Sequence, residues 1–129
     1  MEDVDFSDDF CQFLQTSIPA VDVAEVLLYL RRNAGASHSL PEIVAGLKGS
    51  TSLSESEVEK HVEGLRARQL VSIDAEKRVR FAPGSEALGA HAATLAAAYV
   101  ERPVTLIRVI YALRDSKIKT FAEAFRIKR

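Results

Sequence analysis

Apolar side chains recur at intervals of three to four residues through much of the chain, which is the spacing of amphipathic helices. Near the N-terminus this stripe consists of Phe6, Phe10, Phe13 and Leu14. The stripe predicts a short acidic helix within residues 1–19 that packs on the rest of the protein. We expect it to end before Pro19, because proline cannot continue a helix.

Three more helices are predicted where a capping pattern precedes an apolar face. A residue that can accept a hydrogen bond from a helix N-terminus, followed three positions later by glutamate, marks a helix start. This pattern occurs at Asp22, Ser39 and Ser54. The faces that follow are Val23, Val26, Leu27 and Leu30, then Leu40, Ile43, Val44 and Leu47, then Val58, Val62 and Leu65. Small residues at 49–52 join the last two helices, which is typical of a helix-turn-helix.

The apolar period then falls to two residues. Residues 71–73 and 78–81 alternate apolar and polar side chains on either side of the turn-like stretch 74–77, and Pro83-Gly84 follows. A helix, a helix-turn-helix and a hairpin in this order predict a winged helix-turn-helix over residues 20–84. The predicted fold class is therefore mainly α, with a small two-stranded β wing and additional C-terminal helices.

Residues 85–129 are expected to form that C-terminal helical extension. Ser85 can cap a helix that reaches about Val100, and Pro103 opens a helix that is apolar on most sides. A capping box at Thr120 predicts a last short helix. A small protein buries so apolar a helix only with difficulty, so the extension is expected to serve dimerisation or partner docking. Its candidate interface residues are Leu106, Ile107, Ile110, Tyr111, Phe121 and Phe125.

Part of this pattern resembles a known family. The residues concerned are Leu40-Pro41-Glu42-Ile43-Val44, Ser54, Val58, His61-Val62, Leu65 and Gln69-Leu70-Val71. They resemble the winged-helix bacterial transcriptional regulators of the MarR and related groups, in which the phrase leucine, basic, three residues, leucine, valine leads from the third helix into the wing. Glycine is usual at the position of Gln69, which leaves open whether the turn into the wing is the same. The resemblance covers about half the chain and implies a fold more firmly than a function, since winged helices bind DNA, RNA and proteins.

The 129 residues carry a net charge of −1 that is unevenly distributed. Residues 1–30 hold seven acidic side chains and no lysine or arginine, whereas residues 100–129 hold eight basic and three acidic side chains. The two ends can pair within or between chains, or the basic end can face an anion. A single cysteine, no signal-peptide pattern and no apolar stretch long enough to span a bilayer predict a soluble cytoplasmic protein without membrane contact.

The sequence predicts no catalytic residues, metal site or cofactor. Residues 46–51 resemble a phosphate-binding loop, but Lys48 precedes Gly49 where the motif requires lysine after the second glycine. The three histidines lie in separate elements without the spacing of metal ligands. Cys11 lies in an acidic helix, which does not lower a thiol pKa toward a reactive thiolate. We therefore expect a non-enzymatic protein.

Two functions fit this sequence. The first is that of a transcription-associated regulator that contacts DNA through the third helix and a basic wing. Its candidate DNA-binding residues are Ser56, Lys60, His61, Arg66, Lys77, Arg78 and Arg80. The second is protein docking, because the third helix also carries acidic residues that oppose phosphates, with Glu59 and Glu63 as candidate contacts. In either case a homodimer is expected, with the C-terminal helices as its interface.

Overall fold

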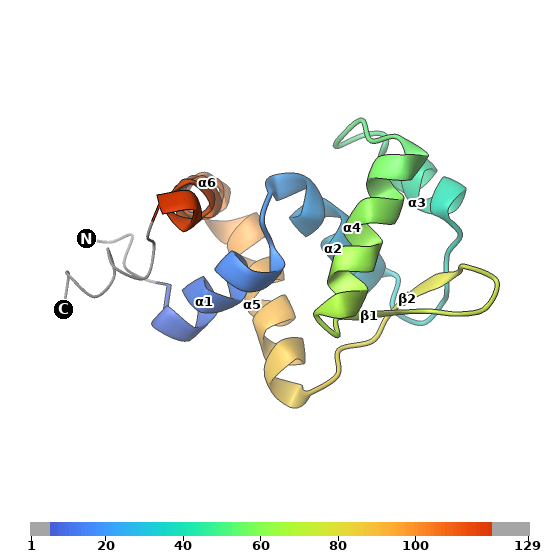
Figure 1. The fold of residues 1–129 in the computed structure, drawn as a ribbon, viewed down its shortest axis with the longest axis horizontal. Coiled ribbons are helices and arrows are strands. Elements are labelled where there is room, and N and C mark those ends of the chain that lie inside the picture. The colour runs from blue at the N-terminus through green and yellow to red at the C-terminus, as the bar shows by residue number, and fades with distance from the viewer. Residues whose placement is uncertain (1–5, 120–129) are drawn as a thin grey trace.

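The computed structural model describes the backbone of residues 6–119 and the side chains of residues 6–114 (Figure 1). This part of the chain is mainly helical, as predicted, with one small antiparallel sheet. Its elements are α1 (Asp8–Ser17), α2 (Val21–Arg32), α3 (Leu40–Leu47), α4 (Glu55–Ala67), β1 (Val71–Ile73), β2 (Val79–Phe81), α5 (Glu86–Glu101) and α6 (Pro103–Lys119). The helix predicted around Phe121 and Phe125 lies outside the described residues.

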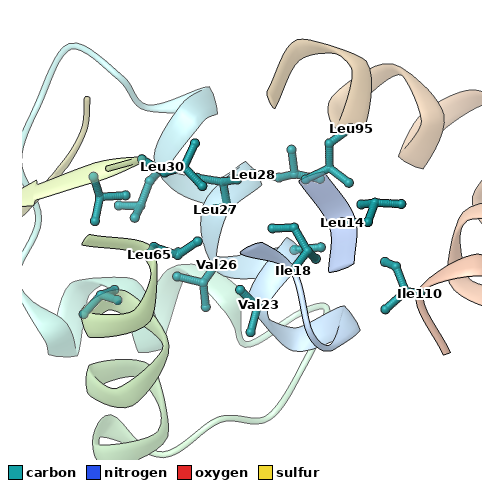
Figure 2. Close-up of a cluster of buried hydrophobic side chains, with 14 of the residues drawn as sticks. Leu14, Ile18, Val23, Val26, Leu27, Leu28, Leu30, Leu65, Leu95 and Ile110 are labelled. Atoms are coloured by element: carbon teal, nitrogen blue, oxygen red, sulfur yellow. The ribbon is translucent and has the colours of Figure 1, made fainter. Parts of the chain in front are cut away.

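Helix α2 lies at the centre of the molecule, because its apolar residues point in several directions. It packs on α3, α4 and β2 on one side and on α5 on the other. Figure 2 shows the resulting core, in which Leu65 of α4, Leu27 and Leu28 of α2 and Leu95 of α5 belong to one cluster. One continuous core therefore joins the helix-turn-helix region to the N-terminal and C-terminal helices.

The N-terminal and C-terminal helices pack against each other. Helix α6 lies on α1 and α5, where Leu106, Ile110 and Leu113 are buried. The aromatic stripe of α1 covers α5, since the rings of Phe13 and His91 stack with centroids 5.0 Å apart. The N-terminal helix thus supplies much of the surface that buries the apolar C-terminal helix.

Local capping explains where most helices begin. The capping boxes predicted at Ser39 and Ser54 are both present, and Ser85 caps α5 by accepting a hydrogen bond from the Leu88 N–H. Asp22 was predicted to cap a helix that begins at Val23. This is wrong, because α2 begins two residues earlier, at Val21, and its N-cap Ala20 makes no side-chain bond. Asp22 instead accepts a hydrogen bond from the Thr51 hydroxyl, at 3.3 Å, in the turn before α4.

The strands form a hairpin in which Val71 pairs with Phe81 and Ile73 with Val79. The other edge of β2 pairs with His38, which exchanges two backbone hydrogen bonds of 2.8 Å with Val79. Gln69 has a φ of 66°, the left-handed conformation that glycine adopts most easily. The turn into the hairpin is therefore of the kind that glycine would favour, although glutamine occupies it.

Among the described residues, no single helix is long and apolar enough to cross a bilayer. Helices α1 and α2 reach that length only when taken together, and they meet at a bend of 100°. Their apolar faces lie in the core.

Candidate functional site

The helix α4 and the hairpin together form the surface that the sequence singled out. Ser54 and Glu57 fix the start of α4, since the Ser54 hydroxyl accepts from the Glu57 N–H at 3.1 Å and the Glu57 carboxylate from the Ser54 N–H at 2.8 Å. The bond to the Ser54 N–H also lowers the pKa of Glu57. With Val58, Val62 and Leu65 buried, α4 presents its charged side to solvent.

Arg78 anchors the hairpin to the loop before α3. Its guanidinium donates to the hydroxyl and carbonyl of Ser37, at 3.0 and 2.9 Å, and to the Glu42 carboxylate at 3.1 Å. Glu42 also accepts from the Ser39 N–H at 2.9 Å, and this bond is the main reason why its pKa is lowered. The candidate DNA contact Arg78 is therefore used within the fold.

The tip of the hairpin is an ordered turn built around Asp74. Its carboxylate accepts hydrogen bonds from the N–H groups of Glu76 and Arg78, both at 2.9 Å. Lys77 adopts a φ of 65° and donates its N–H to the Asp74 carbonyl at 2.9 Å. These bonds fix the Asp74 side chain and the backbone of the turn at Lys77.

A groove runs between α4 and the hairpin, with a volume of about 280 Å³. Its apolar lining comes from α3, α4, both strands and the turn between them: Leu40, Val62, Ile73, Ala75 and Val79. Its charged lining consists of Glu59, Glu63, Asp74 and Lys77. We call this the α4–hairpin groove. Three carboxylates against one lysine leave the lining acidic, although Glu63 is paired with Arg66 beside the groove. The buried residues Val62 and Val79 form its apolar floor.

The other candidate DNA contacts are placed unevenly around this groove. Ser56, Lys60 and Arg80 are exposed, as is Lys77 at the hairpin tip. Arg66 forms an ion pair with Glu63 at 2.8 Å, in which both side chains are about half exposed. His61 is half-buried, and burial is the main cause of its lowered pKa. The exposed candidates thus include Ser56, Lys60, Lys77 and Arg80. Arg66 and Arg78 form ion pairs within the chain.

The candidate interface residues divide into core and surface. Leu106 and Ile110 are 0% and 1% exposed, so they belong to the core of the monomer and are not available to a partner in this structure. Ile107 is half-buried, and Tyr111 is 47% exposed. Glu59 and Glu63 are exposed on α4, whereas Phe121 and Phe125 lie outside the described residues.

The junction of α5 and α6 exposes two apolar side chains that the sequence analysis did not single out. Val100 is 78% exposed and Val104 is 70% exposed. Tyr111 lies two helical turns after Val104, and the Arg114 guanidinium lies 5.4 Å from the centre of its ring. A partner of the C-terminal helices would meet these residues and not Leu106 or Ile110.

The cysteine and two of the histidines, all outside the groove, make contacts within the fold. Burial, with a smaller contribution from Asp8, raises the pKa of Cys11, so its thiol stays protonated at neutral pH. The His38 backbone pairs with β2, and the His91 ring stacks on Phe13. Within the described residues, no group of three His, Cys, Asp or Glu side chains is arranged to hold a metal ion.

Sequence reasoning found Glu59 and Glu63 but not the groove that they line. Asp74 had been assigned only to a turn, Leu40 to the apolar face of a helix and Ile73 to a strand. Which side of α4 faces the hairpin is decided by long-range packing, for which the sequence gives no local signal.

No protein-family model matches this chain, and no curated protein or solved structure matches it either.

Proposed function

We propose that residues 20–84 form a non-enzymatic winged-helix domain of a transcription-associated protein, and that it binds another protein through the α4–hairpin groove. The winged-helix assignment is supported by the order of α2, α3, α4 and the hairpin, which follows that of such domains. The association with transcription is supported by the resemblance of residues 40–71 to MarR-type regulators.

The observation that carries this proposal is the set of three carboxylates around an apolar floor. In a DNA-binding winged helix, the exposed side of the helix at the position of α4 enters the major groove. Affinity for DNA comes largely from neutralising phosphates, and here Glu59, Glu63 and Asp74 oppose them. Their charges act within the Debye length of about 8 Å at physiological salt on any phosphate held in the groove. An apolar floor with an acidic rim suits a protein segment better.

Photo-crosslinking from the groove tests protein docking. A photoreactive benzoylphenylalanine at Ala75, which lines the groove, is expected to give a discrete adduct with the added mass of one protein when the chain is expressed in its own cells. The same residue at Ala93, exposed on α5, is the matched control and is expected to give none. If Ala75 yields no adduct, or if both positions yield the same adducts, the groove is not a docking site.

A second candidate function is contact with DNA through the hairpin. The observation that favours it is the exposure of Lys77 and Arg80, neither of which forms an ion pair with a described side chain. Positive side chains on such a hairpin can follow a phosphate backbone or enter a minor groove.

Fluorescence anisotropy with a labelled random duplex separates the two functions. For a docking domain, we expect no tight binding at about 50 mM salt, and measurable binding only after Glu59→Lys combined with Glu63→Lys removes the repulsion. For a DNA-binding hairpin, the unaltered protein binds, and two phosphate contacts predict a fall of roughly tenfold between about 50 and about 200 mM salt. That binding should be lost on Lys77→Glu with Arg80→Glu. Arg78 is not used, because its loss would also release the hairpin.

A further inference from the structure

We propose that the α4–hairpin groove binds residues 120–129 of a second copy of this chain, so that the protein associates through its own C-terminal segment. This inference rests on the proposed function, because it names the occupant of the same groove. It draws on the groove's size and charge, the composition of the segment and the layout of the molecule.

The size of the groove suits a few side chains of a peptide. Its volume of about 280 Å³ lies at the lower limit of the roughly 300–1,000 Å³ that pockets for whole small molecules occupy. It is open at the surface, and the buried residues that line it, Val62 and Val79, are apolar. One or two large apolar side chains can therefore enter while the neighbouring residues stay at the rim.

Residues 120–129 have the complementary composition. Phe125 and Ile127 alternate with Arg126 and Lys128, and Arg129 follows. Phe125 and Ile127 therefore each have a basic residue directly beside them in sequence, whereas Phe121 does not, and Glu123 is the one acidic residue of the segment. Lysine and arginine have long stems that let their charges reach carboxylates while an adjacent apolar group is buried. The matching charges at the rim are Glu59 and Asp74, together with Glu63, whose carboxylate is shared with Arg66.

The layout of the molecule favours a second copy as the source of this segment. Figure 1 shows α6, which precedes the segment, at the opposite end of the long axis from the hairpin. Helix α6 packs on α1 and α5, whereas the hairpin packs on α2 and α4. Because α6 and the hairpin lie at opposite ends of one copy, the segment that enters the groove is assigned to a second copy.

The acidic side of α1 is the rival site for the same segment. Asp8 and Asp9 are exposed on α1, which packs directly on α6. The exposed residues of α1, however, are all polar: Asp8, Asp9, Gln12 and Thr16. That surface offers charge without an apolar floor for Phe125 or Ile127. The groove offers both, so it is the favoured site.

Sedimentation velocity with paired charge reversals tests the proposal on the full-length chain. The unaltered protein should associate reversibly, and less so at high salt because the rim charges are exposed. The groove variant, Glu59→Lys with Glu63→Lys, and the tail variant, Arg126→Glu with Lys128→Glu, should each lower the association constant at least about tenfold. Mixing the two variants should restore association, because the acidic groove of one then meets the basic tail of the other.

A control variant separates this effect from a change in net charge. Glu86→Lys with Glu101→Lys alters two exposed residues of α5 by the same total charge as the groove variant, and we expect it to associate normally. Circular dichroism melts should show that every variant folds.

Three outcomes would overturn the proposal. The first is an unaltered chain that stays monomeric at all concentrations; if a groove crosslink to a different protein is then found, the docking function stands without this occupant. The second is association that survives the groove variant but is lost with the tail variant or with Asp8→Asn and Asp9→Asn, which would place the segment on α1. The third is association that neither the groove variant nor the tail variant changes, which would assign it to another face.

Discussion

Gln69 occupies, between α4 and β1, a backbone conformation that glycine adopts more easily. In its left-handed conformation, a residue other than glycine costs roughly 1–2 kcal/mol. Its carbonyl accepts a hydrogen bond from the Gly84 N–H at 2.8 Å, which ties the end of α4 to the start of α5. A Cβ atom on Gly84 would lie 2.8 Å from the Gln69 side-chain oxygen. A side chain at 84 would therefore require the flexible Gln69 side chain to shift.

Glu25 of α2 forms a side-chain hydrogen bond with α5. Tyr99 of α5 donates its hydroxyl hydrogen bond to the Glu25 carboxylate. Burial raises the pKa of Glu25 above its ordinary value of 4.5, although the nearby Arg32 lowers it in part. Because the folded state holds this proton more tightly than the unfolded state, the contribution of Glu25 to stability falls as pH rises from about 4.5 through the folded pKa.

Replacing Glu25 by glutamine should therefore stabilise the protein at pH 7. The gain is expected to be small, within about 0.5 kcal/mol, because the carboxylate is partly exposed and screened by solvent. It should shrink toward zero at about pH 4, where the glutamate is itself mostly protonated. Urea unfolding at the two pH values measures this difference. Tyr99→Phe is the control, since it removes the hydrogen bond at both. A Glu25→Gln protein that is less stable at pH 7 would instead show that Arg32 outweighs burial.

At the scale of elements, what was predictable from sequence was local. The boxes at Ser39 and Ser54 involve groups three residues apart, and the hairpin follows from alternation within residues 71–81. All the residues that form each of these patterns lie within one helical turn or one pair of neighbouring strands. The sequence around Asp22 fits the same capping pattern, but Asp22 does not cap α2. The helix begins at Val21, and the Asp22 carboxylate accepts a hydrogen bond from Thr51, which lies 29 residues away.

Contacts between elements were not predictable in the same way. Arg78 had the sequence environment of an exposed hairpin residue, yet it bonds with Ser37 and Glu42. The packing of α1 on α6 joins segments about 100 residues apart, and nothing local in either segment identifies the other. The α4–hairpin groove depends on the same kind of contact. For this reason its acidic residues on α4 were identified from sequence, whereas its floor was not.

At the scale of the whole molecule, the continuous core determines which apolar residues remain for partners. The high apolar content of α6 suggested an interface, but α1 covers the side of the helix that carries Leu106 and Ile110. Figure 2 shows Ile110 beside Leu14 of α1, within the cluster that extends to Leu65 of α4. The exposed residue Val104, on the same helix, lies outside this core.

This division predicts opposite results for two substitutions in α6. Ile110→Ala should lower the free energy of unfolding by about 2–5 kcal/mol, because it opens a cavity between α6 and α1. Val104→Ser should change it by less than about 0.5 kcal/mol, because the side chain is 70% exposed. Urea unfolding monitored by circular dichroism gives both values, and sedimentation at the same concentrations shows whether either change alters association. If Ile110→Ala leaves stability intact but abolishes association, Ile110 is an interface residue. The N-terminal helix would then have to move away from α6 when a partner binds.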